Sequence, residues 1–245
     1  MAKKFFNNIT TYYTALAIGI ASFARGAKAA DAPASAEPKA PSAVNASADT
    51  DALLYKELIT FEGYAPVSYK DGHYVDPNTH EVSVGHSIYY GHQLRPGEIL
   101  NLTQEQAKDL LRDDIAKNKQ IVKRWAANPL FQKHPTHHVT LNQHQLDGLA
   151  ALVFNIGPKP IYSGTLGKKL IAGDYEGAAA EFLKWDKILN EKTKEYEVNP
   201  RQKLRRETDE AMFVGDDAKV KTKIGEVAKI NQPIHHHKKK SSPSK

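Results

Sequence analysis

The 245-residue sequence contains no cysteine, so it can form neither a disulfide framework nor a catalytic thiol. It also lacks a long hydrophobic run, because the apolar stretch near residues 14–24 is too short and too polar for a comfortable membrane span. We find no internal repeat. The hydrophobic content of 40% is nevertheless enough for one core of roughly 150 residues, with tails left over.

The histidines do not replace the missing thiols as metal ligands. His134, His137 and His138 lie in a proline-containing loop, and we find no His-x-x-x-His pair on a predicted helix. Three more histidines, at 235–237, precede three lysines near the C-terminus. We therefore expect no metal site and no other cofactor.

The charge balance is basic, with a formal net charge of +6 and a pI of about 9.2. Such a balance favours an anionic partner, such as nucleic acid, a membrane surface or an acidic cell-wall polymer. Much of the charge lies in residues 214–245, which we predict to be a disordered basic tail. This tail could bind anionic wall polymer or outer-membrane lipid, more strongly in acid as its histidines become charged.

The N-terminal 50 residues have the composition of an export signal followed by a linker. In residues 1–30, two lysines precede the apolar stretch, and Ala27-Lys28-Ala29 fits an Ala-x-Ala cleavage site. We expect a signal peptide, or a weak anchor that tethers the protein to the membrane, and a location in the periplasm or outside the cell. Residues 31–50 are mostly Ala, Pro and Ser, which predicts a flexible linker.

Residues 51–213 have the patterning of one globular α+β domain. Thr-x-x-Gln capping boxes at Thr103 and Thr140 each precede apolar residues at helical spacing. Residues 64–94 are instead rich in Tyr, Val, Gly and turn pairs, and predict a short antiparallel sheet. We expect a small sheet lobe, a larger helical lobe and a ligand site in the cleft between them.

Glu62 is the acid with the most unusual surroundings. It ends an apolar run that includes Leu58, Ile59 and Phe61, and a glycine follows it at once. Because burial disfavours a charged carboxylate, apolar surroundings would favour the protonated form of this side chain. The plainer interpretation is an exposed acid at a helix C-terminus, where the helix dipole does not favour it.

Four sequence blocks share their key residues, in order, with one known family. They read LITFEGYAPVSYKD (58–71), LTQEQAKDLLRDDI (102–115), a central block with FNIG and GTLGKKL (141–185), and RQKLRRETDEAMF (201–213). These blocks resemble the phage-type lysozymes, glycoside hydrolase family 24. The resemblance covers about residues 51–213, and four blocks in order are far more specific than any single motif.

The resemblance implies a lysozyme-like two-lobe fold and a muramidase. Such enzymes cleave the β-1,4 bond between N-acetylmuramic acid and N-acetylglucosamine in peptidoglycan, with inversion. The general acid maps onto Glu62, and an aspartate and a hydroxyl residue of the following hairpin place the attacking water. General chemistry agrees, because glycoside hydrolysis needs one protonated carboxyl and one ionised carboxylate. A monomer that acts on peptidoglycan glycan strands is then expected, in phage lysis or in bacterial wall remodelling.

The hairpin departs from the family pattern, so two positions stay open. Asp71 keeps the Tyr-Lys-Asp context and is favoured, whereas Asp76 keeps nearly the usual spacing to the next strand. The family's threonine is absent. Ser83 is the first candidate to replace it, and Ser87 replaces it in a second alignment frame, since either serine keeps a hydroxyl that can hold water.

Other residues match the family with less specific roles. Asn155 and Thr165 fall where the family lines its cleft and are expected to bind substrate, although Asn155 could instead cap a helix. Arg205 and Arg206 are expected to form structural ion pairs. The main rival functions are a non-catalytic peptidoglycan-binding module and a lytic transglycosylase, which needs only one acid. Nucleic-acid binding, which would weaken steeply with salt, is not expected.

Overall fold

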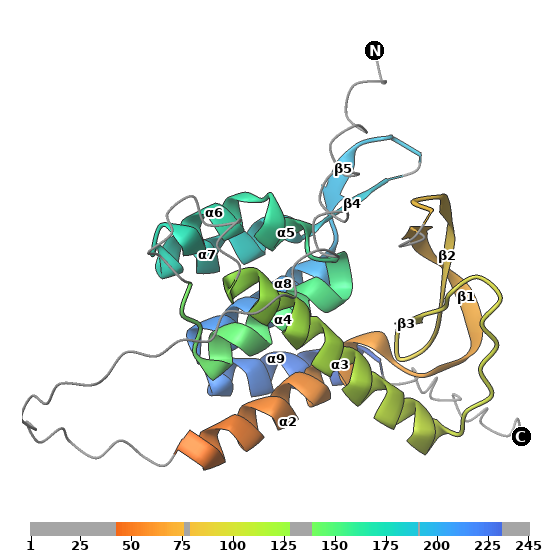
Figure 1. The fold of residues 1–245 in the computed structure, drawn as a ribbon, viewed down its shortest axis with the longest axis horizontal. Helices are drawn as coiled ribbons and strands as arrows, with labels where there is room; N and C mark the ends of the chain where they lie inside the picture. The colour runs from red at the N-terminus through yellow and green to blue at the C-terminus, as the bar shows by residue number, and fades with distance from the viewer. Residues whose placement is uncertain (1–42, 76–78, 128–138, 191, 232–245) are drawn as a thin grey trace, which may run out of the picture.

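The computed structural model describes residues 43–75, 79–127, 139–190 and 192–231. Figure 1 shows a small antiparallel sheet beside a larger group of helices, which confirms the predicted α+β class and its two lobes. The predicted signal peptide, the histidines of the 134–138 loop and Asp76 lie outside the described residues. In the described ranges, no helix combines the length and the apolar character that crossing a membrane requires.

The helical lobe surrounds α4, which is buried over most of its length. Every residue of α4 from Leu146 to Val153 is buried, because the helix packs against α2, α3 and α8. The helices are α2 (Ala43–Glu62), α3 (Gln104–Ala127), α4 (Gln143–Ile156), α5 (Lys159–Tyr162), α6 (Thr165–Ile171), α7 (Tyr175–Phe182), α8 (Pro200–Val214) and α9 (Asp217–Ile230), with a 3₁₀ turn, η2, at Leu183–Trp185.

The sheet lobe consists of β1 (Ala65–Val75), β2 (Val82–Tyr89) and β3 (His92–Gln93), paired antiparallel in that order. Tyr69 lies opposite Ser87, and the register shifts between Lys70 and His73. A second hairpin, β4 (Lys187–Leu189) and β5 (Tyr196–Val198), directly precedes α8. Its strands are solvent-exposed along their whole length.

The helix that ends at Glu62 begins earlier than predicted, so the linker prediction is wrong for residues 43–50. α2 starts at Ala43 and runs through the segment assigned to the flexible linker. Alanine has the highest helix propensity, and extending an existing helix is far easier than nucleating one. The packed turns around Leu54 and Leu58, both almost fully buried, supply the stable part from which the helix extends.

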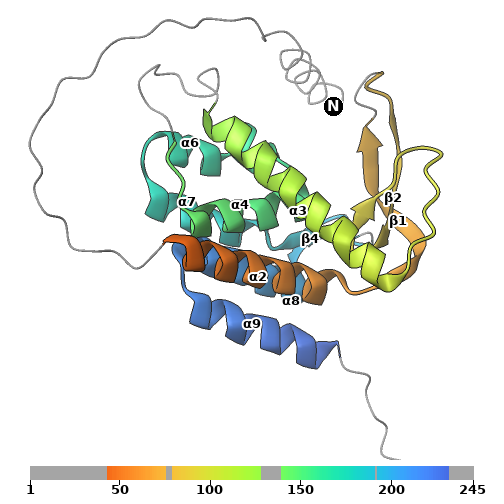
Figure 2. The same cartoon turned by 60° about the horizontal axis from the view of Figure 1, so that its bottom comes forward.

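The prediction of a disordered tail is wrong for residues 217–230, which form α9. Asp216 caps its N-terminus by accepting a hydrogen bond from the backbone N–H of Lys219 at 3.0 Å. The lysine-rich composition indicated disorder, although the segment also has an apolar stripe at helical spacing. Figure 2 shows α9 running alongside α2 and α8. The stripe consists of Val220, Ile224 and Val227, each no more than 3% exposed.

The two predicted capping boxes have different outcomes. The box at Thr103 is confirmed, because Thr103 and Gln106 exchange side-chain hydrogen bonds with each other's backbone N–H. The box at Thr140 is wrong. The N-cap of α4 is Asn142, two residues after Thr140, and it exchanges the equivalent bonds with Gln145. Asparagine is as good an N-cap as threonine, so local composition did not decide between the two registers.

Candidate active site

Glu62 is the last residue of α2 and is held there by an ion pair. Gly63 adopts φ +69° and ends the helix, and its N–H donates to the Ile59 carbonyl at 3.1 Å. The Nη1 atom of Arg205 lies 2.7 Å from Glu62 Oε1, with the two side chains 6% and 16% exposed. Glu62 is therefore neither an exposed acid nor a carboxyl surrounded only by apolar groups. The predicted structural ion pair of Arg205 is confirmed, and its partner is the candidate acid.

The second carboxylate oxygen of Glu62 lies against a glycine. Gly91 follows β2 and adopts φ +80°. A Cβ built at Gly91 would lie 3.1 Å from Glu62 Oε2 and 3.4 Å from Phe154 Cε1. Both the positive φ and the close approach require glycine at this position. Oε1 is thus occupied by a guanidinium, and Oε2 is left as the oxygen of Glu62 that can carry a proton.

The hairpin supplies a second acid with a hydroxyl partner. The Oγ of Ser87 donates to Asp71 Oδ2 at 2.8 Å, which joins β1 to β2. Ser87 is 1% exposed, whereas Asp71 is exposed. Ser83, the first candidate of the sequence prediction, lies four residues away on the same strand, opposite Tyr74, and is itself exposed. The structure therefore brings Ser87, and not Ser83, to Asp71.

Tyr69 connects the two acids electrostatically. Burial, followed by the negative charges of Glu62 and Asp71, raises the pKa of its phenol, and Arg205 partly opposes this. Tyr69 lies directly opposite Ser87 in the sheet, and Asp71 follows it by two residues on the same strand. Because alternate residues of a strand share a face, this pairing is consistent with one cluster. The sequence prediction did not assign a role to Tyr69, although it belongs to the Tyr-x-Asp motif.

A fully buried group of charged side chains lies behind the Arg205–Glu62 pair. Glu57, Arg206 and Asp209 are each 0% exposed. Arg206 Nη2 lies 3.0 Å from Asp209 Oδ2, so its predicted ion pair is also confirmed. Burial raises the pKa of Glu57 well above the usual glutamate value, and the neighbouring Asp209 raises it further. Burial and the charge of Asp209 thus both favour the protonated form of Glu57.

Arg205 connects this buried group to Glu62. Burial by itself would lower the pKa of Arg205, but the carboxyl groups of Glu62, Asp209 and Glu57 more than offset that effect and raise it. Arg205 therefore stays charged while facing three acids. The sequence could not indicate Glu62 and Glu57 as partners, because they belong to α2, far from α8 along the chain, whereas Asp209 lies on α8 itself, four residues after Arg205.

The two predicted substrate-binding residues differ in position. Asn155, near the end of α4, accepts a hydrogen bond from Arg206 Nη2 at 2.8 Å, which places it beside the buried charged group. It does not cap α4, whose C-cap is Gly157. Thr165 is the exposed first residue of α6, and Figure 1 shows α6 on the far side of the helical lobe from the three-stranded sheet. The structure thus associates Asn155, but not Thr165, with the Glu62 region.

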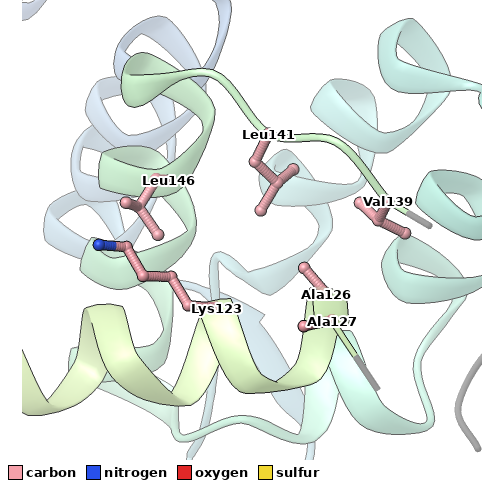
Figure 3. Close-up of a pocket in the computed structure, with 6 residues that line it drawn as sticks. All are labelled: Lys123, Ala126, Ala127, Val139, Leu141 and Leu146. Carbon is pink, nitrogen blue, oxygen red and sulfur yellow. The ribbon is translucent and has the colours of Figure 1, made fainter. Parts of the chain in front are cut away.

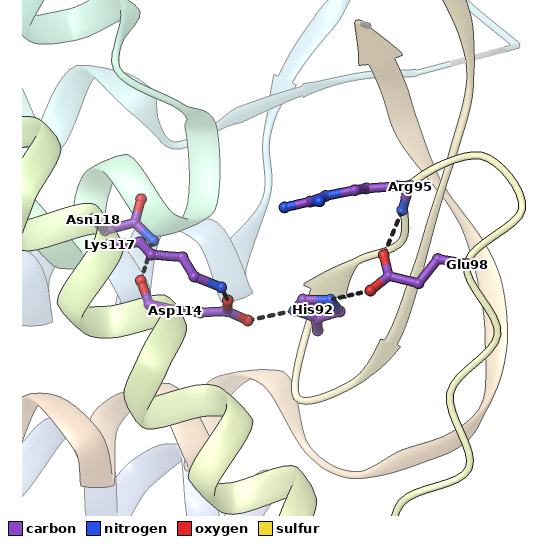
Figure 4. Close-up of polar contacts among 6 residues, drawn as sticks. All are labelled: His92, Arg95, Glu98, Asp114, Lys117 and Asn118. Carbon is purple, nitrogen blue, oxygen red and sulfur yellow. Dashed lines mark hydrogen bonds and ion pairs between the residues drawn. The ribbon is translucent and has the colours of Figure 1, made fainter. Parts of the chain in front are cut away.

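A polar network joins the sheet lobe to α3 beside the candidate site (Figure 4). His92 Nδ1 lies 2.6 Å from Asp114 Oδ2, and Lys117 Nζ lies 2.9 Å from Asp114 Oδ1. Burial would raise the pKa of Asp114, but the hydrogen bonds from His92 and Lys117 outweigh it and lower the pKa. His92 belongs to β3 and Asp114 to α3, so this contact holds the two lobes together.

The helical lobe also has a hollow of about 420 Å³, which lies elsewhere. Figure 3 shows that its walls come from the end of α3, residues 139–141 and the start of α4. Leu146, one of the lining residues, precedes Phe154 by eight residues on α4, or about 12 Å along the helix axis. Among the described residues that line it, Lys123 is the one charged residue and no acid is present, so these residues do not provide the two carboxyl groups of a glycosidase.

Comparison with known proteins assigns the family. The model described as phage lysozyme matches residues 59–209, more than half of the chain. The chain belongs to the phage lysozyme family. The matched range includes both acids, Ser87 and Arg205, which confirms the resemblance drawn from the sequence. The matched range ends at residue 209, before α9 begins.

Similar proteins include phage endolysins. The chain is 41% identical over 103 residues to the endolysin of Acyrthosiphon pisum secondary endosymbiont phage 1, covering 41% of this chain and 62% of that protein. It is 31% identical over 128 residues to the endolysin of Bacillus phage B103, covering 52% and 42%. The chain thus spans less than two thirds of the length of either relative. The muramidase domain of SpmX from Asticaccaulis excentricus shares the fold, with a TM-score of 0.51 and 21% identity over 66% of this chain and 94% of that domain.

Proposed function

We propose that this member of the phage lysozyme family is an N-acetylmuramidase that hydrolyses the β-1,4 bond between N-acetylmuramic acid and N-acetylglucosamine in peptidoglycan. In this proposal Glu62 is the general acid, and Asp71 and Ser87 place the attacking water. The observation that carries it is the setting of Glu62, whose Oε1 is paired with Arg205 at 2.7 Å while Oε2 faces Gly91. One oxygen orients the carboxyl and the other transfers the proton.

The proposed reaction divides the work between two carboxyl groups. Glu62 protonates the leaving glycosidic oxygen from Oε2, and Asp71, as a carboxylate, accepts a proton from the water that attacks the sugar carbon. The Ser87 hydroxyl donates its own hydrogen to Asp71 and therefore keeps lone pairs that can accept a hydrogen bond from the same water. Ser87 thus takes the role that the resemblance assigns to a hairpin threonine.

The first test replaces the proton donor and keeps its shape. Glu62→Gln retains an oxygen that can accept the Arg205 hydrogen bond, so the protein should stay folded. The turnover of purified peptidoglycan should fall by about 10²- to 10⁴-fold, the usual contribution of a general acid. Glu81→Gln, which changes an exposed acid of the same hairpin, is the matched control and should retain full activity. Equal rates for the wild type and Glu62→Gln would favour the non-catalytic wall-binding module.

A second test compares two serines of one strand. Ser87→Ala should lower kcat by about tenfold, because the water loses one partner and Asp71 loses a hydrogen bond worth about 1.4 kcal/mol. Ser83→Ala, at the exposed position of β2, should leave kcat unchanged. If Ser83→Ala were the damaging change, the proposed site would be misplaced along the hairpin.

A lytic transglycosylase is the rival enzyme. Such an enzyme needs one acid and closes a 1,6-anhydro ring, whereas a muramidase adds water. The Asp71–Ser87 pair beside Tyr69 supports the muramidase, because it supplies the second carboxylate that hydrolysis by water requires.

We further propose that the protein acts outside the inner membrane, on the basis of the signal-like residues 1–30. Cell fractionation should find it in the periplasm or the medium, and the mature N-terminus should follow Ala29. Retention in the cytoplasm would contradict the export proposal without affecting the enzymatic one.

A further inference from the structure

The end of α9 meets the end of the helix that carries Glu62. Asn231, which follows α9 directly, donates from Nδ2 to the Thr60 carbonyl oxygen at 2.9 Å. Its Oδ1 accepts a hydrogen bond from Arg201 Nη1, also at 2.9 Å. Arg201 in turn donates through Nη2 to the Phe61 carbonyl. Two consecutive carbonyls immediately before Glu62 are thus bound by side chains from other elements.

These carbonyls need partners because they belong to the last turn of α2. The final carbonyls of a helix have no partner within the helix and carry the negative end of its dipole. The Ile59 carbonyl is bonded by the N–H of Gly63, but the Thr60 and Phe61 carbonyls depend on Asn231 and Arg201. Without these partners the last turn would fray, and Glu62 lies in that turn.

The Phe61 side chain also holds the end of α2 in place, through contacts with α8. Phe61 is 3% exposed and its ring lies near two guanidinium groups, with Arg201 at 6.0 Å and Arg205 at 5.5 Å from the ring centre. Arg205 is also the ion-pair partner of Glu62. A shift of the α2 terminus would therefore alter the position of Glu62 relative to Arg205.

α9 is packed firmly enough to position its own last residue. Its apolar stripe of Val220, Ile224 and Val227 is buried, and the helix packs against both α2 and α8. Lys219 and Lys223 form ion pairs with acids of α8 at 2.8 and 2.9 Å. The helix is thus held along its length, and Asn231 at its end is fixed beside Thr60.

We propose that α9, which lies beyond the matched range, is a positioning element of the active site, and that Asn231 is its positioning residue for Glu62. Asn231 touches no reacting atom. It fixes the last turn of α2, so that Glu62 is held in line with Arg205 and the leaving oxygen. Small displacements of a catalytic group reduce its contribution to the rate steeply. This inference rests on the proposed function, because it assigns a support to the acid of that site.

The test compares point variants of the full-length chain. Asn231→Ala removes both side-chain hydrogen bonds, and Asn231→Asp keeps the acceptor for Arg201 but loses the donor to Thr60. Thr222→Ala, at an exposed position of the same helix, is the control. With peptidoglycan as substrate, well below the unfolding temperature, we expect Asn231→Ala to lower kcat about three- to tenfold and to leave KM within about twofold. Asn231→Asp should be intermediate, and Thr222→Ala should match the wild type.

A second readout does not depend on turnover. Amide hydrogen exchange at Glu62 and Gly63 should be about three- to tenfold faster in Asn231→Ala than in Thr222→Ala, because the last turn of α2 opens more often. Unchanged exchange, or an unchanged kcat in an active protein, would overturn the inference. If the wild type and Glu62→Gln were equally inactive while exchange still responded, the proposed function would fail and the support of α2 by Asn231 would stand.

Discussion

At the scale of single residues, one guanidinium organises the candidate site. Arg205 is 5% exposed and faces Glu62, Asp209 and Glu57. Buried charges are stable only when paired, and three ionised acids beside Arg205 and Arg206 would leave an excess of negative charge. The raised pKa of Glu57 reduces this excess, because it favours the neutral form of that side chain. The ion pair with Glu62 can then form without competition from a third carboxylate.

The raised pKa of Glu57 predicts a stability that depends on pH. The folded protein keeps this proton above pH 4.5 while the unfolded chain releases it, so stability is lost as the pH rises from 4.5 towards the folded pKa. Asp209 raises that pKa, whereas Arg205 and Arg206 oppose the rise. Glu57→Gln should therefore unfold at a higher temperature than the wild type at pH 8, by about 2–4 °C for each kcal/mol recovered. Near pH 4 the two should coincide, and a constant loss at every pH would contradict this.

The sequence predicted the acids better than their partners. Glu62 and Asp71 stand in local motifs, so neighbouring residues were enough to nominate both as candidates. Ser83 and Ser87 lie on one strand face about 13 Å apart, and a local pattern of period two gives both the same weight. Only the register of β2 against β1, with its irregularity after Lys70, brings Ser87 to Asp71.

At the scale of elements, the position of the sheet relative to the helices depends on a short contact. β3 has two residues, and one of them, His92, pairs with Asp114 of α3 at 2.6 Å. Both side chains are less than 15% exposed, so the pair is only weakly screened by solvent. This contact fixes the sheet that carries Asp71 and Ser87 relative to the helical lobe that carries Glu62.

The lowered pKa of Asp114 predicts the opposite pH dependence to that of Glu57. Its contribution to stability is present above the ordinary aspartate pKa of 3.8 and is lost as the pH falls through the lower folded value. Asp114→Asn should destabilise the protein by about 1 kcal/mol at pH 6, the scale of one charge-assisted hydrogen bond after solvent screening.

The control for Asp114 lies on the same helix. Asp109→Asn changes the acid of an ion pair whose side chains are 57% and 75% exposed, so its effect on the unfolding temperature should be negligible. If the gap between Asp114→Asn and the wild type did not narrow as the pH falls below 3.8, the lowered folded pKa of Asp114 would not be the cause.

Elements were predictable where the chain has strong local patterns. The helix after Thr103 and the sheet within residues 64–94 were found because a capping box and turn signals indicated them. α9 was missed because eight lysines between 214 and 245 dominated the composition. Its short apolar stripe is buried only because α9 packs against α2 and α8, and the sequence does not show that packing.

At the scale of the whole molecule, a helix beyond the matched range supports the helix that carries the candidate acid. The two-lobe α+β architecture followed from the order of patterns along the chain, with sheet signals between two sets of helical signals. The close packing of three distant segments around Glu62 could not be predicted from that order. The end of α2, the start of α8 and the end of α9 converge there through Arg201 and Asn231, and no local rule specifies such contacts.

The central claim is that this protein adds water to a glycosidic bond of peptidoglycan, with Glu62 as the acid. The most direct measurement is digestion of purified peptidoglycan in ¹⁸O-labelled water, followed by mass spectrometry of the released muropeptides. We predict one ¹⁸O atom at each new N-acetylmuramic acid reducing end, and none of these products with Glu62→Gln. Unlabelled 1,6-anhydro products, or release that persists in Glu62→Gln, would contradict the account.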